Sequence, residues 1–106
     1  DGSMVRDYVY VEDLARMIGQ VVLAGPTQEV YNLGSGEGRT VASVLESIRS
    51  VTGRDFDIRI ASKPATFVDR ITLDVDRYNA EFGKPTLTKF ETGIAATWEE
   101  VLRQCQ

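Results

Sequence analysis

Residues 5–15 read VRDYVYVEDLA, and this stretch decides how the rest of the chain is interpreted. Its first half mixes β-branched and aromatic residues, which is typical of a strand, so we predict a short strand over 5–11. Its second half places two acids at the start of an apolar pattern with helical spacing. We therefore predict a helix from residue 12 or 13 to about 24, where Gly25 and Pro26 end it.

The next residues continue the alternation of short strands and helices. We predict a strand over 30–33, a glycine-rich turn over 34–38, and a helix over 41–52 that Thr40 caps and Gly53 ends. Residues 56–60 alternate apolar with charged side chains, the period-two pattern of a half-buried strand.

The last third of the chain is predicted to be mainly helical. After a brief extended stretch over 71–73, Asp74 can cap a short helix that Gly83 closes. Thr88 and Glu91 have the spacing of a capping box for the last helix. The expected fold is a small α/β unit with few short strands and about four helices.

Composition excludes several classes of function. The chain has 106 residues, the size of one domain, and its net charge of −4 opposes binding to nucleic acid. Its longest apolar run, 21–24, is far too short to span a membrane. Cys105 is the single cysteine and there is no histidine, so we expect no disulfide, no metal site and a reducing, cytoplasmic setting.

Four blocks in order give the chain a specific likeness. They are VRDYVYVEDLA at 5–15, YNLGSG at 31–36, LDVDR at 73–77 and GIAATW at 93–98. Together they resemble the extended short-chain dehydrogenase/reductase superfamily, in particular its NAD-dependent, UDP-glucose 4-epimerase-like members. The strand so soon after Asp1 has no upstream partner, so we also expect the chain to be part of something larger.

The resemblance implies a division of labour between two domains. In such enzymes an N-terminal Rossmann domain holds NAD and the catalytic Ser/Thr and Tyr-x-x-x-Lys, and a C-terminal domain grips the nucleotide-sugar. Residues 1–106 resemble the second domain and contain no Tyr-x-x-x-Lys, so we expect no catalysis and no bound NAD without the missing Rossmann half. The parent enzyme would then be a nucleotide-sugar 4-epimerase acting on a UDP-sugar or a related donor. A related dehydratase, decarboxylase or reductase, or a non-catalytic interaction module on the same scaffold, is the alternative.

Arg6 is the first candidate ligand residue. It matches the family arginine that contacts the diphosphate, and a planar, permanently charged fork suits phosphate oxygens. In a strand Tyr8 shares the face of Arg6 and could line the same pocket. The alternatives are a surface ion pair of Arg6 with Asp7 or Glu12, and a core role for Tyr8.

A second phosphate clamp departs from the family pattern. Relatives commonly have Arg-x-x-Asp ahead of the aspartate that corresponds to Asp74, and this chain has Pro64 and Phe67 at those places. Asp69 and Arg70 lie nearby and could substitute, or could be ordinary exposed charges.

Two further expectations concern the glycine loop and the missing domain. Residues 34–38 lie between a strand and a helix but have the spacing G-x-G-x-G, so we interpret them as a turn rather than as a dinucleotide-binding loop. We also expect an exposed apolar patch drawing on residues 5–11, and through it self-association.

Overall fold

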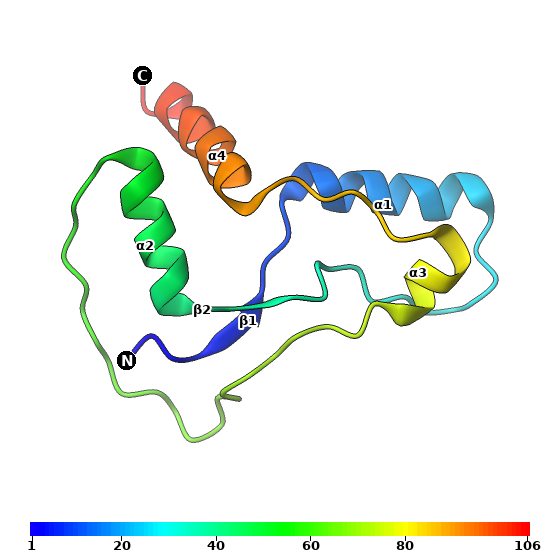
Figure 1. Cartoon of the computed structure of the whole chain (residues 1–106), viewed down its shortest axis with the longest axis horizontal. Coiled ribbons are helices and arrows are strands. Elements are labelled where there is room, and N and C mark those ends of the chain that lie inside the picture. The colour runs from blue at the N-terminus through cyan, green and yellow to red at the C-terminus, as the bar shows by residue number, and fades with distance from the viewer.

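The computed structural model describes all 106 residues and contains two short strands and four helices. Figure 1 shows them in chain order: β1 (Val5–Asp7), α1 (Val11–Ala24), β2 (Gly38–Thr40), α2 (Val41–Thr52), α3 (Asp76–Phe82) and α4 (Phe90–Gln104). The predicted α/β class and the number of helices are confirmed. None of the helices has the length and apolar character that crossing a bilayer requires.

The strand β1 is the centre of the small sheet. It pairs antiparallel with β2, with Val5 opposite Thr40, Arg6 opposite Arg39, and Asp7 opposite Gly38. On its other edge Val5 forms a parallel bridge with Arg70, in which the Val5 N–H donates to Asp69 O at 2.9 Å and the Ile71 N–H donates to Val5 O at 3.0 Å. Both edges of β1 are therefore occupied at Val5.

One strand was predicted too long and two predicted strands do not form. The strand predicted over 5–11 ends at residue 7, because the chain turns there into α1. Residues 30–33 form no strand. The second strand lies instead at 38–40, directly after the glycine-rich turn, where it pairs with β1. Residues 56–60 form no strand either and lie in the long connection between α2 and α3 (Figure 1). A period-two pattern gives a strand only where a partner strand supplies the ladder, and 56–60 have none.

The α2 boundaries agree with the predicted ones. The Thr40 hydroxyl accepts a hydrogen bond from the Ser43 N–H at 3.1 Å, and Gly53 has φ 65° with its N–H bonded to Arg49 O at 2.9 Å. These are the N-cap and left-handed C-terminal turn that the sequence predicts. Helix α2 then packs against α4.

The two other predicted caps differ from the structure. Asp74 accepts a hydrogen bond from the Asp76 N–H at 3.0 Å, but α3 begins only at Asp76 and has no side-chain cap. Helix α4 begins at Phe90 without a side-chain cap, so the capping box of Thr88 with Glu91 does not form. The Thr88 hydroxyl donates instead to Asp13, a buried carboxylate that needs donors more than the solvated helix end does.

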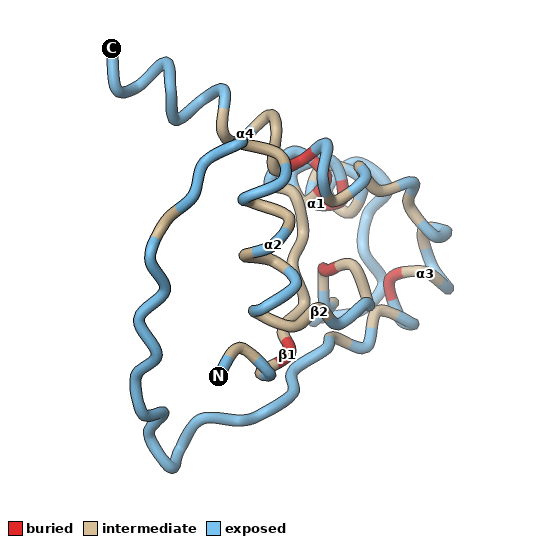
Figure 2. Tube along the Cα trace, turned by 60° about the vertical axis from the view of Figure 1, so that its left-hand side comes forward, coloured by how far each residue is buried: buried red, intermediate tan, exposed pale blue.

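The chain is an open layer with little core. Its radius of gyration is 16.2 Å, against about 13 Å for a compact domain of this length. Its extents are 46 × 39 × 19 Å, and the hydrophobic side chains that are buried are Val5, Met17 and Tyr78. Figure 2 shows these buried positions as short separate segments in a mostly exposed trace.

The apolar surface predicted over residues 5–11 is present only in the second half of that stretch, where Tyr8, Val9, Tyr10 and Val11 line an apolar groove. Val5 is only 9% exposed, whereas the outer side of α1 carries Ile18, Val22 and Leu23 at 49%, 70% and 88% exposure. Val11, at the first turn of α1, is the one large apolar residue of 5–11 that is strongly exposed. Exposed apolar side chains therefore also lie on α1 and in the connection between α2 and α3, whereas β1 uses Val5 for its own small core.

Candidate functional site

Two arginines lie opposite each other in the sheet. Arg6 and Arg39 are register partners, so their side chains leave on the same face, opposite to the face of Val5 and Asp7. The Arg6 guanidinium donates to Val5 O at 2.7 Å and takes part in none of the ion pairs of the chain. The predicted alternative, an ion pair of Arg6 with Asp7 or Glu12, does not form.

Asp7 is not free to pair with Arg6 because it binds the glycine loop. Its carboxylate accepts from the Ser35 N–H at 2.9 Å, the Ser35 hydroxyl at 2.6 Å, the Gly36 N–H at 2.9 Å and the Leu73 N–H at 3.3 Å. The loop is thus a turn wrapped around an internal carboxylate. Amides that already bind Asp7 cannot cradle a pyrophosphate, so these residues do not fit the phosphate-binding loop of a dinucleotide.

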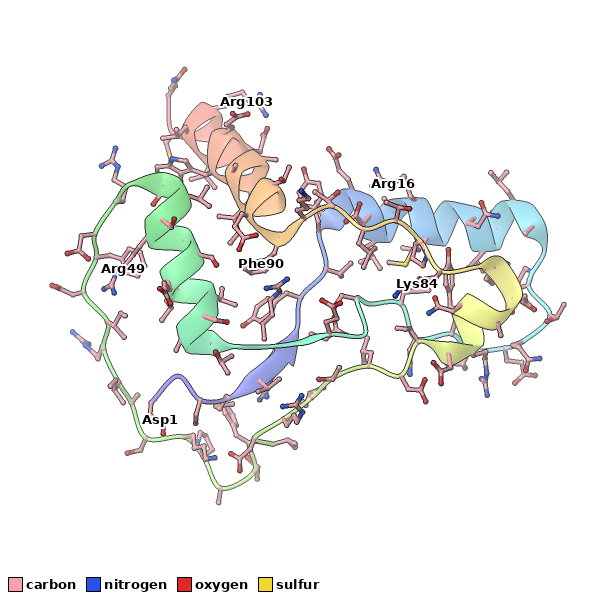
Figure 3. The ribbon with its side chains drawn as sticks, in the orientation of Figure 1. Asp1, Arg16, Arg49, Lys84, Phe90 and Arg103 are labelled. Atoms are coloured by element: carbon pink, nitrogen blue, oxygen red, sulfur yellow. The ribbon has the colours of Figure 1, made fainter.

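A polar pocket of about 270 Å³ opens beside the two strands. It is bounded by the residue after β1, the glycine loop, β2 and the segment between α3 and α4; its charged and aromatic lining residues are Tyr8, Glu37, Arg39, Lys84, Lys89 and Phe90. Three cations face one carboxylate there, so the pocket is positive although the chain is acidic overall. Figure 3 labels Lys84 in the segment before α4 and Phe90 at the start of that helix.

Aromatic contacts hold the arginine in this pocket. The Arg39 guanidinium carbon lies 4.1 Å from the centroid of the Phe90 ring, a cation–π distance. The Tyr8 ring meets the same Phe90 edge-on, with centroids 6.2 Å apart. Tyr8 therefore lines the pocket and also helps to fix Phe90, under which Arg39 is positioned.

Asp13 fixes Thr88, one of the residues that line the pocket. It is 3% exposed and accepts hydrogen bonds from the Thr88 N–H and hydroxyl, both at 2.8 Å, and it forms an ion pair with Arg16. The segment that carries Lys84 and Lys89 is thereby tied to α1. Asp7 and Asp13 are the two internal carboxylates around which the site is assembled.

The two weaker candidates form no hydrogen bond or ion pair with Arg6, although their backbone pairs with Val5 beside it. Asp69 forms an ion pair with Lys63. A guanidinium nitrogen of Arg70 lies 3.4 Å from the position of a Cβ on Gly38, beside the Val5 side chain and so on the opposite face of the sheet from Arg6. The structure brings Tyr8 to the pocket and Arg6 opposite Arg39, whereas Arg6, Asp69 and Arg70 are not among the residues that line the pocket.

Sequence reasoning missed Arg39, Lys84 and Lys89. Arg39 follows the glycine loop directly, but only the strand register shows that it faces the same way as Arg6. Lys84 and Lys89 flank a Pro-Thr-Leu-Thr stretch with no recognisable signal. The Asp13–Thr88 bond, which joins residues 75 apart, is what brings these lysines to the pocket.

An apolar groove of about 490 Å³ adjoins the polar pocket. It runs between α2 and α4, and its apolar lining includes Val44, Ile48, Ile94, Trp98 and Val101. Tyr8, Thr88, Lys89 and Phe90 line both hollows. The combined surface suits a ligand with an anionic part and a flat, weakly polar part.

Comparison with known proteins gives consistent relatives. None of the known protein-family models matches the chain. It is 31% identical over 99% of its length to the dTDP-glucose 4,6-dehydratase of Salmonella typhimurium and 33% identical over 92% to the UDP-glucose 4-epimerase of Corynebacterium glutamicum. It spans 31% of the length of each of these relatives.

Solved structures agree with the sequence relatives. The Thermotoga maritima UDP-glucose 4-epimerase with UDP-glucose matches all of this chain with a TM-score of 0.84 and 30% identity, and 34% of that chain is covered. The Thermus thermophilus UDP-glucose 4-epimerase complex with NAD matches 90% of this chain with a TM-score of 0.76 and 29% identity, and 30% of that chain is covered.

Proposed function

We propose that this chain is the substrate-binding part of an NAD-dependent nucleotide-sugar 4-epimerase. The proposal starts from the family: the chain belongs to the extended short-chain dehydrogenase/reductase superfamily, as a C-terminal region of its nucleotide-sugar epimerases and dehydratases. In this proposal residues 1–106 hold the nucleotide diphosphate. The rest of the enzyme holds NAD and the acid–base pair.

The observation that carries the proposal is the unpaired Arg6 opposite Arg39. Like charges directly opposite each other on a sheet repel, and a bound anion between or beside them removes that repulsion. A diphosphate offers several charged oxygens to two planar forks. Tyr8 and Phe90 fix the Arg39 guanidinium, and both also line the apolar groove, where a nucleobase or sugar ring can lie.

The proposed division of labour follows from what the chain's own residues can do. The Ser35 and Gly36 amides of the glycine loop bind Asp7 and the Glu37 amide binds the Ser35 hydroxyl, so the cofactor would contact other parts of the enzyme. NAD accepts and returns a hydride in the family's reaction. The residues of this chain would bind and orient the nucleotide-sugar and take no part in proton transfer. We therefore expect the isolated chain to have no epimerase turnover.

A 4,6-dehydratase acting on a dTDP-sugar is the second candidate. The Salmonella typhimurium dehydratase matches almost the whole chain, with an identity within a few percent of that of the epimerase relatives. The two candidates differ in the nucleotide, and the cation pair serves both because it would contact the diphosphate rather than the base.

Calorimetric titration of UDP, dTDP and GDP into the chain tests the proposal. Arg6→Ala should weaken diphosphate binding by roughly 1.5–3 kcal/mol, about 10- to 150-fold, and Arg6→Lys should recover only part of this because a point charge lacks the fork. Arg103→Ala, which removes the same charge from the far end of α4, is the control and should leave binding unchanged. Absence of binding to all three nucleotides, or an unchanged dissociation constant in Arg6→Ala, would overturn the proposed role.

A further inference from the structure

The Arg39 guanidinium is held by an aromatic ring and not by an acid. Its carbon lies 4.1 Å from the centroid of the Phe90 ring. Arg39 is not among the arginines that donate hydrogen bonds or form ion pairs within the chain, although Glu37 lines the same pocket. A carboxylate would fix an arginine by neutralising it, whereas an aromatic face leaves the charge and the in-plane N–H donors for another partner. Arg39 is therefore positioned without being neutralised.

A second arginine of the chain shows the contrast. Arg49 lies over the Phe56 ring, with its guanidinium carbon 4.8 Å from the centroid. It also donates to Phe56 O at 2.8 Å and pairs with Asp55 at 3.2 Å, so its donors are used within the chain. The same kind of stacking contact fastens a connection at Arg49, whereas at Arg39 it directs a charged fork to a pocket.

Phe90 is itself fixed from two sides. The Tyr8 ring meets it edge-on, with centroids 6.2 Å apart. Two residues before Phe90, the Thr88 N–H and hydroxyl both donate to the buried Asp13 at 2.8 Å. Because the ring is held through Tyr8 and through the backbone that leads into α4, it can serve as a firm support for Arg39.

Arg39 needs such a support because of its place in the sheet. It lies opposite Arg6, and like charges directly opposite each other repel. Without the ring, the Arg39 side chain would turn away from Arg6, and a ligand that uses both arginines would have to reorder it at a cost in side-chain entropy. The Phe90 face opposes this movement and keeps the second guanidinium preorganised.

We propose that Phe90 is a positioning residue that acts through Arg39 and makes the site select a nucleoside diphosphate over the monophosphate. This rests on the proposed function, in which the diphosphate binds at Arg6 and Arg39. A single phosphate is satisfied by one guanidinium, so a monophosphate gains little from a fixed Arg39. A diphosphate brings a second phosphate, which the preorganised Arg39 binds without being reordered.

Calorimetric titration of UDP and UMP into the chain and its Phe90 variants tests the proposal. Phe90→Leu keeps an apolar side chain but removes the ring, so it should weaken UDP binding about 3- to 10-fold and UMP binding by less than about twofold. Phe90→Tyr keeps the ring and should bind UDP to within about twofold of the parent. Phe56→Leu removes the ring under Arg49 and is the matched control, which should change neither affinity.

A double-mutant cycle separates positioning from packing. In an Arg39→Gln background, Phe90→Leu should change the UDP affinity by less than about twofold, because the side chain through which Phe90 acts is gone. Circular dichroism identifies the folded variants. Phe90→Met is a second apolar replacement without a ring, so the comparison does not depend on the folding of one variant.

The outcomes distinguish this proposal from the proposed function. If the parent binds UDP and Phe90→Leu binds it to within about twofold, the positioning role is overturned and the diphosphate site stands. Equal weakening of UDP and UMP, no recovery in Phe90→Tyr, or a full effect of Phe90→Leu in the Arg39→Gln background also overturns it, because each is the behaviour of a residue that only packs. A parent chain that binds neither nucleotide overturns both proposals.

Discussion

At the residue scale, two carboxylates of the block VRDYVYVEDLA decide the structure more than its arginine does. Asp7 gathers Ser35, Gly36 and Leu73, and Asp13 gathers Thr88 and Arg16. Each connects stretches that are far apart in the sequence. The characteristic pattern of this block is therefore largely a pattern of internal hydrogen bonding, and Arg6, which precedes both acids, bonds to neither.

Asp13 gives the sharpest prediction for stability. Asp13→Ala leaves the Thr88 N–H and hydroxyl without an acceptor in a part-buried place, and we expect a loss of about 2–3 kcal/mol in the free energy of unfolding. Urea denaturation measures it. Glu12→Ala, which removes an exposed neighbouring acid, is the matched control and should cost less than about 0.5 kcal/mol. Equal effects of the two variants would show that Asp13 acts only as a charge near the start of α1.

Tyr78 predicts a dependence of stability on alkaline pH. Burial raises the pKa of Tyr78 above its ordinary value of 10.0. The phenol therefore ionises more readily in the unfolded chain than in the folded one, and its contribution to stability, complete below pH 10.0, is lost as the pH rises through the raised pKa. Tyr78→Phe removes the ionisable phenol and with it the alkaline loss of stability, so the stability of the variant relative to the parent should rise between neutral and strongly alkaline pH. Thermal melting of both proteins across that range checks it, and parallel curves would contradict it.

At the element scale, the four helices and β1 were predictable from the sequence, whereas β2 was not. Helix boundaries depend on local chemistry, and the boundaries of α2 follow from Thr40 and Gly53 alone. The strands depend on remote partners. β2 forms because the hydrogen bonds of Asp7 hold the glycine loop beside β1, and no pattern within residues 38–40 predicts this contact.

The candidate site was predictable to the same extent. Tyr8 and Arg6 come from a recognisable block, whereas Arg39 needs the strand register and the two lysines need the Asp13–Thr88 contact. The remaining blocks are also joined at long range, since the Asn32 amide donates to Asp74 O at 3.1 Å and Arg77 donates to Val30 O at 2.9 Å. Such contacts become visible only when the chain is folded.

The caps of α2 and α4 make a matched pair of predictions. Thr40→Ala removes the acceptor of the Ser43 N–H and should destabilise the chain by about 1 kcal/mol. Glu91→Ala should change the free energy of unfolding by less than about 0.5 kcal/mol, because no capping box exists at the start of α4. Chemical denaturation of both variants is the measurement. A larger cost for Glu91→Ala than for Thr40→Ala would mean that α4 is capped in solution.

At the scale of the whole molecule, the open shape is the main feature. The accessible surface is 7870 Å², against about 5,900 Å² for a compact protein of the same mass. Much of the excess is apolar, on the outer side of α1 and along the connection between α2 and α3. Surface that a compact domain would bury is left for contacts beyond this chain.

The outer side of α1 therefore should contribute nothing to the chain's own stability. Leu23 is 88% exposed and Met17, on the same helix, is 2% exposed. Leu23→Lys should change the free energy of unfolding by less than about 0.5 kcal/mol, whereas Met17→Lys should unfold the chain by placing an unpaired charge in its small core. Urea denaturation separates the two variants. Light scattering should show less self-association of Leu23→Lys than of the parent, because the variant exposes less apolar surface on this helix. A loss of more than about 2 kcal/mol in Leu23→Lys would mean that the face is buried in solution, because only a buried leucine carries that much hydrophobic stabilisation.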